Sequence, residues 1–378
     1  MAKFTKVFEA LERAILEGKF AHGKRLPSES ELCQRFKVSR PTAARALREL
    51  QQMGVITRRA GSGSYLTPPH AARPAASRTL GLFVPGLGNT EILSPICNEI
   101  TRYAQSLNCA VRWGDASTPI NSSEDALRLC QQYIENPVDG IFFAPIESIA
   151  GREAWNRKIA DAFAQKGIPM VLLDRDLGEF PSQSEFDMIG IDNVAAGIML
   201  TRHLLERGRK RICFTARPHY PSTSNLRLLG VREALRLYGP KPRLKYRLAH
   251  FGKPTDPEFV QRMLETSMPD AIICSNDQTA ALLIRTLTQL HYSVPDQIAV
   301  AGFDDVEYAS LLTPSLTTMR QPCSEIARTA VRTLIERIGD PSLPPRHIQH
   351  CATLVVRQSC GLQQAVQPPE LEVPSPSM

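Results

Sequence analysis

The feature that most constrains the fold is an alternation of short apolar runs with amphipathic stretches, which begins at Arg78 and continues almost to the end of the chain. Short apolar runs predict strands buried on both faces, and their alternation with helices predicts βαβ units and parallel sheets. The predicted strands are 80–84, 140–144, 170–173, 188–191, 211–215, 271–274 and 298–302. The predicted helices are 95–107, 124–134, 154–166, 195–206, 227–238, 258–265, 279–291 and 323–338.

The N-terminal part of the chain differs from this α/β body in its charge. Residues 1–68 contain 13 Lys and Arg against 6 Asp and Glu, whereas the other 310 residues contain 32 of each kind. The net charge of +7 therefore lies in a small N-terminal module. A basic module joined to an electroneutral body predicts contact with a polyanion such as DNA. The Pro- and Ala-rich residues 69–78 predict a linker, and the Pro-rich residues 363–378 predict a disordered tail.

The pattern within residues 1–68 predicts a helix-turn-helix. After an amphipathic helix over residues 3–20, Ser28 and Glu31 form a capping box that predicts the start of a second helix. Ser39 can cap a third helix, which has a proline in its first turn and a glycine just past its end. In a helix-turn-helix, the N-terminal end of the later helix enters the major groove of DNA. Arg40 lies at that end, where its guanidinium can pair with O6 and N7 of guanine.

A β-wing is predicted to follow, because residues 55–66 read as a strand, a glycine-containing turn and a second strand. The stretch as a whole reads LPSESELCQRFKVSRPTAARALRELQQMGVITRRAGSGSYL and resembles the GntR-type winged helix. Ser30 and Ala44 stand where many members of that family have arginine. From the resemblance and the basic surface together, we expect the DNA-binding residues to be Ser39, Arg40, Thr42, Arg45, Arg58, Arg59, Gly61, Ser62 and Gly63.

Polar residues follow several predicted strands of the α/β body. Asp174, Asn276 and Asp304 each come directly after an apolar run. Because ligands of open parallel sheets bind at the carboxyl ends of the strands, these side chains could share one cleft. Carboxylates and amides can bind the many hydroxyls of a sugar, although Asn276 or Asp304 taken alone could equally cap the next helix.

The α/β body resembles the LacI family and the related periplasmic sugar-binding proteins, above all in VPDQIAVAGFDD and LTPSLTTMRQP. The resemblance implies a type I periplasmic-binding-protein-like domain over 79–362, built from two Rossmann-like subdomains. We expect subdomain 1 at about 79–177 and 321–340 and subdomain 2 at about 178–320 and 341–362, with crossovers near Leu177 and 317–321. The effector contacts it implies are Asp174, Arg227, Asn276 and Asp304, with Asn89, Phe143, Asp192 and Phe251 as looser candidates.

The sequence therefore predicts an α/β transcription regulator with an N-terminal winged helix-turn-helix, expected to be a homodimeric repressor. Its partners would be a double-stranded DNA operator and a small-molecule effector, a sugar, with a purine or a partner protein as alternatives. No catalytic motif, metal cluster or cofactor site is recognisable; a fused pyridoxal-phosphate enzyme is disfavoured because its lysine would have to lie on a predicted helix. Scattered single cysteines and the absence of a long apolar run favour a cytoplasmic, nucleoid-associated protein without membrane contact.

Overall fold

The computed structural model describes residues 7–8, 10–11, 14–15, 26–52, 56–59, 63–66, 78–84, 91–114, 123–147, 151–218, 220–240 and 247–361. The chain divides into two compact units, Met1–Ala76 and Ser77–Met378. The predicted contact residues Gly61, Ser62 and Asn89 lie outside the described residues, as do most of the predicted linker and the predicted tail.

The N-terminal unit contains helices α2 (Glu29–Phe36) and α3 (Arg40–Gln52) and a hairpin of β1 (Ile56–Arg59) and β2 (Gly63–Leu66). The predicted capping box is present, since the Ser28 amide donates to Glu31 Oε2 (2.6 Å) and the Glu31 amide donates to Ser28 Oγ (3.3 Å). β1 and β2 pair antiparallel, and Arg59 opposes Gly63. A small core holds the unit together; its buried members are Val7, Leu11, Leu26, Leu32, Ala43, Ala46, Leu47, Leu50 and Ile56.

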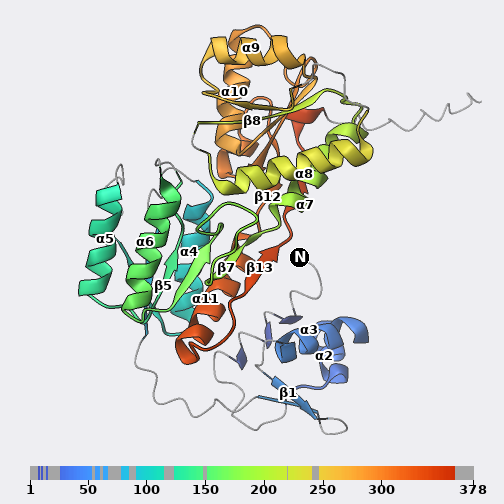
Figure 1. The fold of residues 1–378 in the computed structure, drawn as a ribbon. Helices are drawn as coiled ribbons and strands as arrows, with labels where there is room; N and C mark the ends of the chain where they lie inside the picture. Colours follow the sequence, from blue (N-terminus) through green and yellow to red (C-terminus); the bar gives the residue numbers. More distant parts are fainter. Residues whose placement is uncertain are drawn as a thin grey trace, which may run out of the picture. The chain divides into compact units, whose positions relative to one another are not determined.

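The C-terminal unit contains two lobes, each with a six-stranded sheet between helices (Figure 1). In lobe 1 the strand order is β13-β7-β6-β5-β3-β4, and every pairing is parallel. Its strands are β3 (Thr79–Phe83), β4 (Ala110–Trp113), β5 (Gly140–Phe143), β6 (Met170–Leu173), β7 (Asp187–Ile191) and β13 (His347–His350). Helices α4 (Leu93–Ser106) and α11 (Cys323–Gly339) pack together on one face, and α5 (Ser123–Glu135) and α6 (Arg152–Gln165) cover the other.

Lobe 2 repeats this topology with the strand order β14-β12-β11-β10-β8-β9. All its pairings are parallel except that of β14 with β12. Its strands are β8 (Ile212–Ala216), β9 (Ala249–Phe251), β10 (Ala271–Cys274), β11 (Ala299–Asp304), β12 (Thr317–Arg320) and β14 (Thr353–Val355). Its helices are α7 (Asn193–Glu206), α8 (Ser222–Tyr238), α9 (Pro257–Ser267) and α10 (Asp277–Gln289). In both lobes the first strand lies between the second and the third, so each sheet has a switch point where ligands bind in folds of this kind.

The predicted boundary between the lobes is wrong at two places. β7 lies in the sheet of lobe 1, so the chain first crosses between the lobes after Ile191 rather than near Leu177. β13 also belongs to lobe 1, where it pairs with β7, although residues 341–362 were expected in lobe 2. The reason is that β13, with the sequence HIQH, is an edge strand without the apolar signature of a buried strand. The chain therefore crosses three times: after β7, after β12 and after β13.

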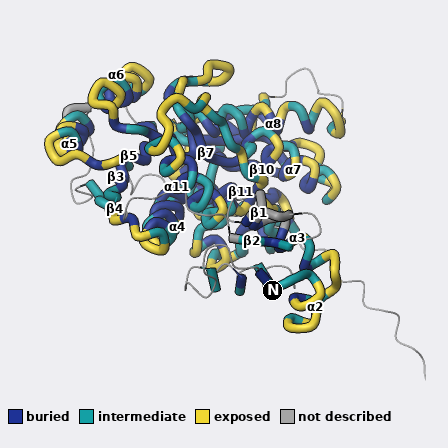
Figure 2. The backbone as a smooth tube through the Cα atoms, turned by 90° about the horizontal axis from the view of Figure 1, so that it is seen from below, coloured by how far each residue is buried: buried dark blue, intermediate teal, exposed yellow. Residues whose placement is uncertain are grey.

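Strand residues alternate between the two faces of each sheet, as strand geometry requires. On β5, Phe142 packs into the core beneath α4 and α11, whereas Ile141 and Phe143 pack into the core beneath α5 and α6. On β11, Ala301 and Phe303 face the side of α7 and α8, whereas Val300 faces α9 and α10. Figure 2 shows the strands buried between helices whose outer sides are exposed.

Helices α7 and α8 approach closely because two glycines meet at their crossing. A Cβ at Gly197 would lie 2.3 Å from the Arg227 carbonyl oxygen, and a Cβ at Gly230 would lie 2.2 Å from the Val194 carbonyl oxygen. Neither oxygen belongs to a side chain that could turn away, so only glycine fits this contact.

We predict that Gly197→Ala forces the two helices apart and lowers the free energy of unfolding by about 1–3 kcal/mol, the usual cost of overpacking. Urea denaturation followed by circular dichroism measures this loss. The matched control is Gly339→Ala at the end of α11, where an added Cβ would meet no atom within 4 Å. An equal loss in both variants would contradict the close-packing explanation.

Candidate functional site

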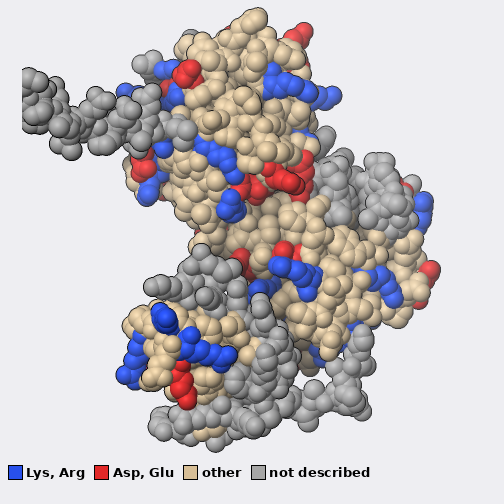
Figure 3. All heavy atoms as spheres, turned by 180° about the vertical axis from the view of Figure 1, so that it is seen from behind, with Lys and Arg blue, Asp and Glu red and all other residues tan. Residues whose placement is uncertain are grey.

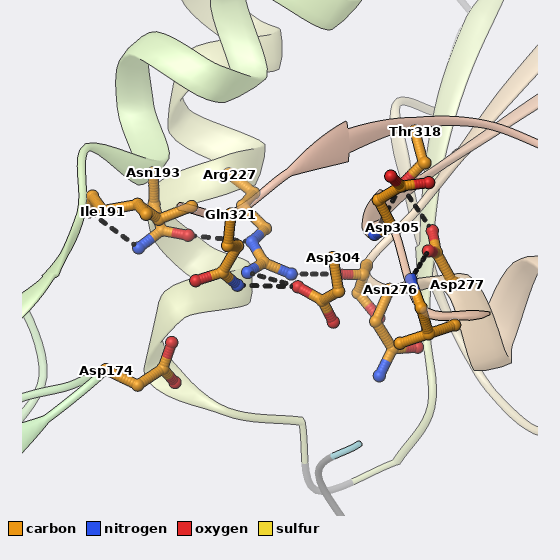
Figure 4. A network of polar contacts seen from close by, with 12 residues as sticks. Asp174, Ile191, Asn193, Arg227, Asn276, Asp277, Asp304, Asp305, Thr318 and Gln321 are labelled. Atoms are coloured by element: carbon orange, nitrogen blue, oxygen red, sulfur yellow. Dashed lines mark hydrogen bonds and ion pairs between the residues drawn. The ribbon is translucent and has the colours of Figure 1, made fainter. Parts of the chain in front are cut away.

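The centre of the site is the guanidinium of Arg227, a buried residue in α8 (Figure 4). Its Nε donates to Asn193 Oδ1 (2.8 Å), Nη1 donates to the Ser275 carbonyl (2.5 Å) and Nη2 donates to Asp304 Oδ1 (3.3 Å). The guanidinium also lies over the ring of Phe303, with Cζ 4.6 Å from the centroid. One side chain thus joins the start of α7 to the carboxyl ends of β10 and β11.

Asp304 and Gln321 form the next part of the site. Asp304 ends β11 with a φ of 111°, which few residues other than glycine adopt, and such backbone strain occurs preferentially at functional sites. Gln321 follows β12 at the second crossover and donates from Nε2 to Asp304 Oδ1 (2.8 Å). Its Oε1 is buried without a hydrogen-bond partner. A ligand group that donates a hydrogen bond would satisfy this oxygen.

A buried network of hydrogen bonds fixes the loop that carries Asp304. Asp277 Oδ2 accepts from the Val306 amide (3.1 Å), and Asp277 Oδ1 accepts from the Thr318 hydroxyl (2.6 Å). That hydroxyl in turn accepts from the Asp305 amide (3.3 Å). Burial raises the pKa of Asp277 well above its ordinary value, and the Asp304 carboxylate adds to the rise.

Lobe 1 contributes Asp174, which follows β6 and points across the gap between the lobes toward the Arg227 group (Figure 4). Its φ is 69°, again in the left-handed region. Asp174 Oδ2 forms an ion pair with Arg175 Nη2 (2.7 Å), and Arg175 Nη1 contacts Glu147. Burial raises the pKa of Asp174, and the Arg227 guanidinium opposes this rise. Asp174 Oδ1 is buried without a partner, so both lobes offer a hydrogen-bond acceptor to the space between them.

Three of the other predicted effector residues have structural roles. Asp192 and Asn276 cap α7 and α10, accepting from the Ala195 amide (2.8 Å) and the Thr279 amide (2.9 Å). The capping alternative considered for Asn276 is therefore observed. Phe143 does not face the cleft: strand alternation turns its ring into the core, where it lies edge-on to Phe83 with centroids 5.2 Å apart.

The fourth looser candidate, Phe251, is partly exposed at the end of β9 and stacks on Tyr220. The two ring centroids are 4.7 Å apart and the rings are nearly parallel.

The sequence analysis missed three residues of the site, Arg175, Gln321 and Asn193. Arg175 directly follows Asp174 in the sequence and Gln321 directly precedes the proline at a crossover, but neither position has a distinctive pattern.

A pocket of about 230 Å³ opens beside Arg175, at the carboxyl ends of β5 and β6 and the start of α8. Polar contacts bridge the lobes around the site. Arg152 of lobe 1 donates to the Tyr220 carbonyl (2.8 Å), and Asn225 of α8 donates to Glu179 Oε2 (3.0 Å).

A second set of contacts joins the lobes at Glu91, just before α4. Glu91 accepts from the Tyr308 hydroxyl and from Gln278 Nε2 (3.4 Å), both in lobe 2. These contacts can form only while the lobes lie close together.

In the N-terminal unit, Lys and Arg side chains gather over α2 and α3 (Figure 3). Among the side chains of these helices that the structure describes, the exposed basic ones are Arg35, Lys37, Arg40 and Arg45. Arg40 begins α3 and forms an ion pair with Glu29 (3.2 Å), while the hydroxyls of Ser39 and Thr42 are 2.8 Å apart. Gly63 begins β2 with a φ of 121°. Arg58 and Arg59 lie on β1, and their side chains are outside the described residues.

Within the described part of the chain, no group of three or more His, Cys, Asp or Glu side chains could hold a metal ion. The described helices include none that is long and apolar enough to span a membrane.

Comparison with known proteins supports both units of the fold. Residues 3–66 match the family model for bacterial regulatory proteins of the gntR family, and residues 201–360 match the model for a periplasmic binding protein-like domain. The predicted fold class is therefore confirmed. A solved structure described as the complex of the transcriptional regulator CelR with cellobiose has a TM-score of 0.64 and 22% identity, covering 85% of this chain and 91% of that chain.

Two characterised relatives are repressors. The arabinose metabolism transcriptional repressor of Geobacillus stearothermophilus is 27% identical over 373 residues, which are 95% of this chain and 98% of that protein. The ribose operon repressor of Escherichia coli (strain K12) is 27% identical over 289 residues, which are 75% of this chain and 82% of that protein. Both relatives are transcription regulators and not enzymes.

We predict that Asp304→Asn lowers the free energy of unfolding by about 3–5 kcal/mol, because Arg227 then stays buried without its carboxylate. By contrast, Asp192→Ala should cost only about 1 kcal/mol, the typical value of an N-cap. Urea titrations of the two variants and the parent chain measure both losses. Equal losses would mean that Asp304 contributes no more than a helix cap.

Proposed function

We propose that this chain, which matches the gntR-family model in its N-terminal unit and the periplasmic binding protein-like model in its C-terminal unit, is a sugar-responsive repressor. Its N-terminal unit binds an operator, and a small sugar binds between the two lobes and releases the DNA. The observation that carries the effector part is the pair of buried acceptors without partners, Asp174 Oδ1 and Gln321 Oε1, which face the space between the lobes.

The arrangement of α2 and α3 supports DNA reading. Arg40 is at the N-terminal end of α3, the part of a recognition helix that meets base edges. Its side chain is 77% exposed, so it can leave the weak surface ion pair with Glu29 when DNA approaches. We expect Ser39, Thr42 and Arg45 to contact the same groove or its phosphates, and the wing that contains Gly63 to contact the DNA backbone.

The chemistry of the cleft supports a sugar as the effector. Asp174 and Gln321 supply acceptors, and Arg175, whose guanidinium nitrogens are buried without hydrogen-bond partners, supplies donors. Together they match hydroxyl groups, which both donate and accept. The stacked Tyr220 and Phe251 rings offer an apolar face of the kind that carbohydrate rings contact. Repressors named for arabinose metabolism and for the ribose operon are 27% identical to this chain, so we favour a pentose.

The two-lobed fold couples this site to DNA binding. A ligand can change operator affinity only if it binds one lobe arrangement better than another. A sugar that contacts Asp174 in lobe 1 and Asp304 in lobe 2 favours the closed arrangement, in which Glu91 also reaches Tyr308. We propose that the chain acts as a homodimer, because helix-turn-helix proteins generally bind two half-sites of a pseudo-palindrome. Closure of the two lobes would then change the distance between the two DNA-binding domains of the dimer.

We predict that Arg40→Ala weakens binding to a selected operator by about 10- to 100-fold, equivalent to the roughly 1–3 kcal/mol of one bidentate base contact. Fluorescence anisotropy with the operator and with an unrelated duplex, at one fixed salt concentration, measures the two affinities. The control is Arg236→Ala, which removes an exposed arginine paired with Glu233 in the other unit. If both duplexes lose equal affinity, Arg40 contacts phosphate and does not read bases.

We predict that L-arabinose or D-ribose releases the operator from the full-length protein, and that Asp174→Asn requires about 10- to 100-fold more sugar, since it loses a charged hydrogen-bond acceptor. Operator anisotropy during titration with sugars, and with purine bases in parallel, measures this response. Asp256→Ala, which removes only the cap of α9, is the control and should respond like the parent chain. Release by purines alone would support the alternative effector, and no release by any compound would refute the effector role.

A further inference from the structure

We infer that Glu91, Gln278 and Tyr308 form a clasp between the lobes that sets how much effector is needed to release the DNA. None of the three side chains is among the expected effector contacts, so the clasp acts on lobe closure and not on the ligand. The inference deepens the proposed function and rests on it, because it requires an effector that favours the closed arrangement.

The clasp consists of one carboxylate from lobe 1 and two donors from lobe 2. Glu91 Oε2 accepts from the Tyr308 hydroxyl, and Glu91 Oε1 accepts from Gln278 Nε2 (3.4 Å). The two donors lie 217 and 187 residues further along the chain, and all three side chains are half-buried. Both oxygens of one carboxylate in lobe 1 are therefore bonded to lobe 2.

The Tyr308 hydroxyl is well suited to donate to this carboxylate. Burial raises the pKa of Tyr308 above its ordinary value, and the hydrogen bond to Glu91 and the charge of Glu91 raise it further. The hydroxyl therefore keeps its proton, and its hydrogen bond to a charged acceptor is stronger than one between neutral groups. Because separated lobes would bond to water instead, only part of this strength favours closure.

The lobe 2 side of the clasp is tied to the loop that carries Asp304. Gln278 directly follows Asp277, whose Oδ2 accepts from the Val306 amide (3.1 Å). Tyr308 lies two residues beyond Val306 on the same segment. A movement of Asp304 toward lobe 1 or away from it therefore carries both donors of the clasp with it.

The other bridge between the lobes differs in this respect. Arg152 and Glu179 both belong to lobe 1 and form an ion pair with each other, in addition to their contacts with the Tyr220 carbonyl and Asn225 of lobe 2. Their charges therefore remain paired when the lobes separate. Within the part of the chain that the structure describes, the hydrogen bonds of the Glu91 carboxylate go only to lobe 2, so closure changes its surroundings more.

A clasp of this kind changes the response to an effector without contacting it. The apparent affinity of a ligand falls in proportion to the fraction of molecules that can adopt the arrangement it binds. A clasp that stabilises the closed lobes raises this fraction, so its loss has to be compensated by more effector. In a chain that is mostly open before the effector binds, the affinity for the operator alone changes little.

Tyr308→Phe tests the clasp, because it removes the hydroxyl and keeps the ring. We expect the Kd of D-ribose or L-arabinose, measured by calorimetry on the full-length protein, to rise about 10-fold, the lower part of the range for a hydrogen bond to a charged group. The sugar concentration that half-releases the operator should rise by the same factor. The matched control is Tyr103→Phe, which removes a hydroxyl that accepts from Arg332 Nε (2.8 Å) within lobe 1 and should leave the response unchanged.

A double-mutant cycle distinguishes the clasp from a general loss of stability. If the Tyr308 hydroxyl acts through the Glu91 carboxylate, Tyr308→Phe should change sugar affinity by no more than about 2-fold in a Glu91→Ala background. The same effect in both backgrounds, or parent-like affinity in Tyr308→Phe alone, would refute the clasp and leave the sugar-effector proposal in place. If no sugar binds the parent chain, the proposed effector function fails and the clasp fails with it.

Discussion

A buried arginine determines much of the architecture of the C-terminal unit. The guanidinium of Arg227 is almost completely removed from solvent, and a charge in that position is tolerable only if nearly all its donors are used. The partners that satisfy it come from the start of α7, the end of β10 and the end of β11. Three segments far apart in the sequence therefore have to meet at one point, and the Gly197–Gly230 contact allows α7 and α8 to come close enough for this.

The same requirement explains why the site lies at the junction of the lobes. The chain crosses between the sheets three times, and Gln321 lies at the second crossing, beside Asp304. Asp174 at the end of β6 faces this group from the other lobe. A ligand that bonds to both sides therefore holds the lobes together, and the bridges from Glu91 and Arg152 strengthen the same closed arrangement. Under the proposed function, ligand binding and lobe closure are one event, which is the property a sensor domain needs.

The sequence predicted strands well where they are continuous apolar runs and poorly where they are not. β5, β6 and β10 are continuous apolar runs and were predicted within a residue of their observed ends. β12 and β13, with the sequences TTMR and HIQH, have no such signature, because their pairing is set by distant chain segments. Missing β13 caused one of the two errors in the lobe boundary; in the other, β7 was predicted as a strand but assigned to the wrong lobe. The capping box at Ser28 was predicted because capping depends only on neighbouring residues.

By itself, the sequence determined the division into two units and the helix-turn-helix, with Arg40 at the N-terminal end of its second helix. It also determined that Asp174 and Asp304 lie at the ends of buried strands. These features were predictable because charge segregation, capping and apolar runs are local properties of the sequence. Only the tertiary structure decided which polar residues remain available for a ligand. Asp192 and Asn276 follow strands just as Asp174 does, yet they cap helices, and Phe143 turns into the core. That Arg175 and Gln321 join the site depends on strand twist, crossover geometry and the packing of α7 on α8, which are set by contacts between residues distant in the sequence.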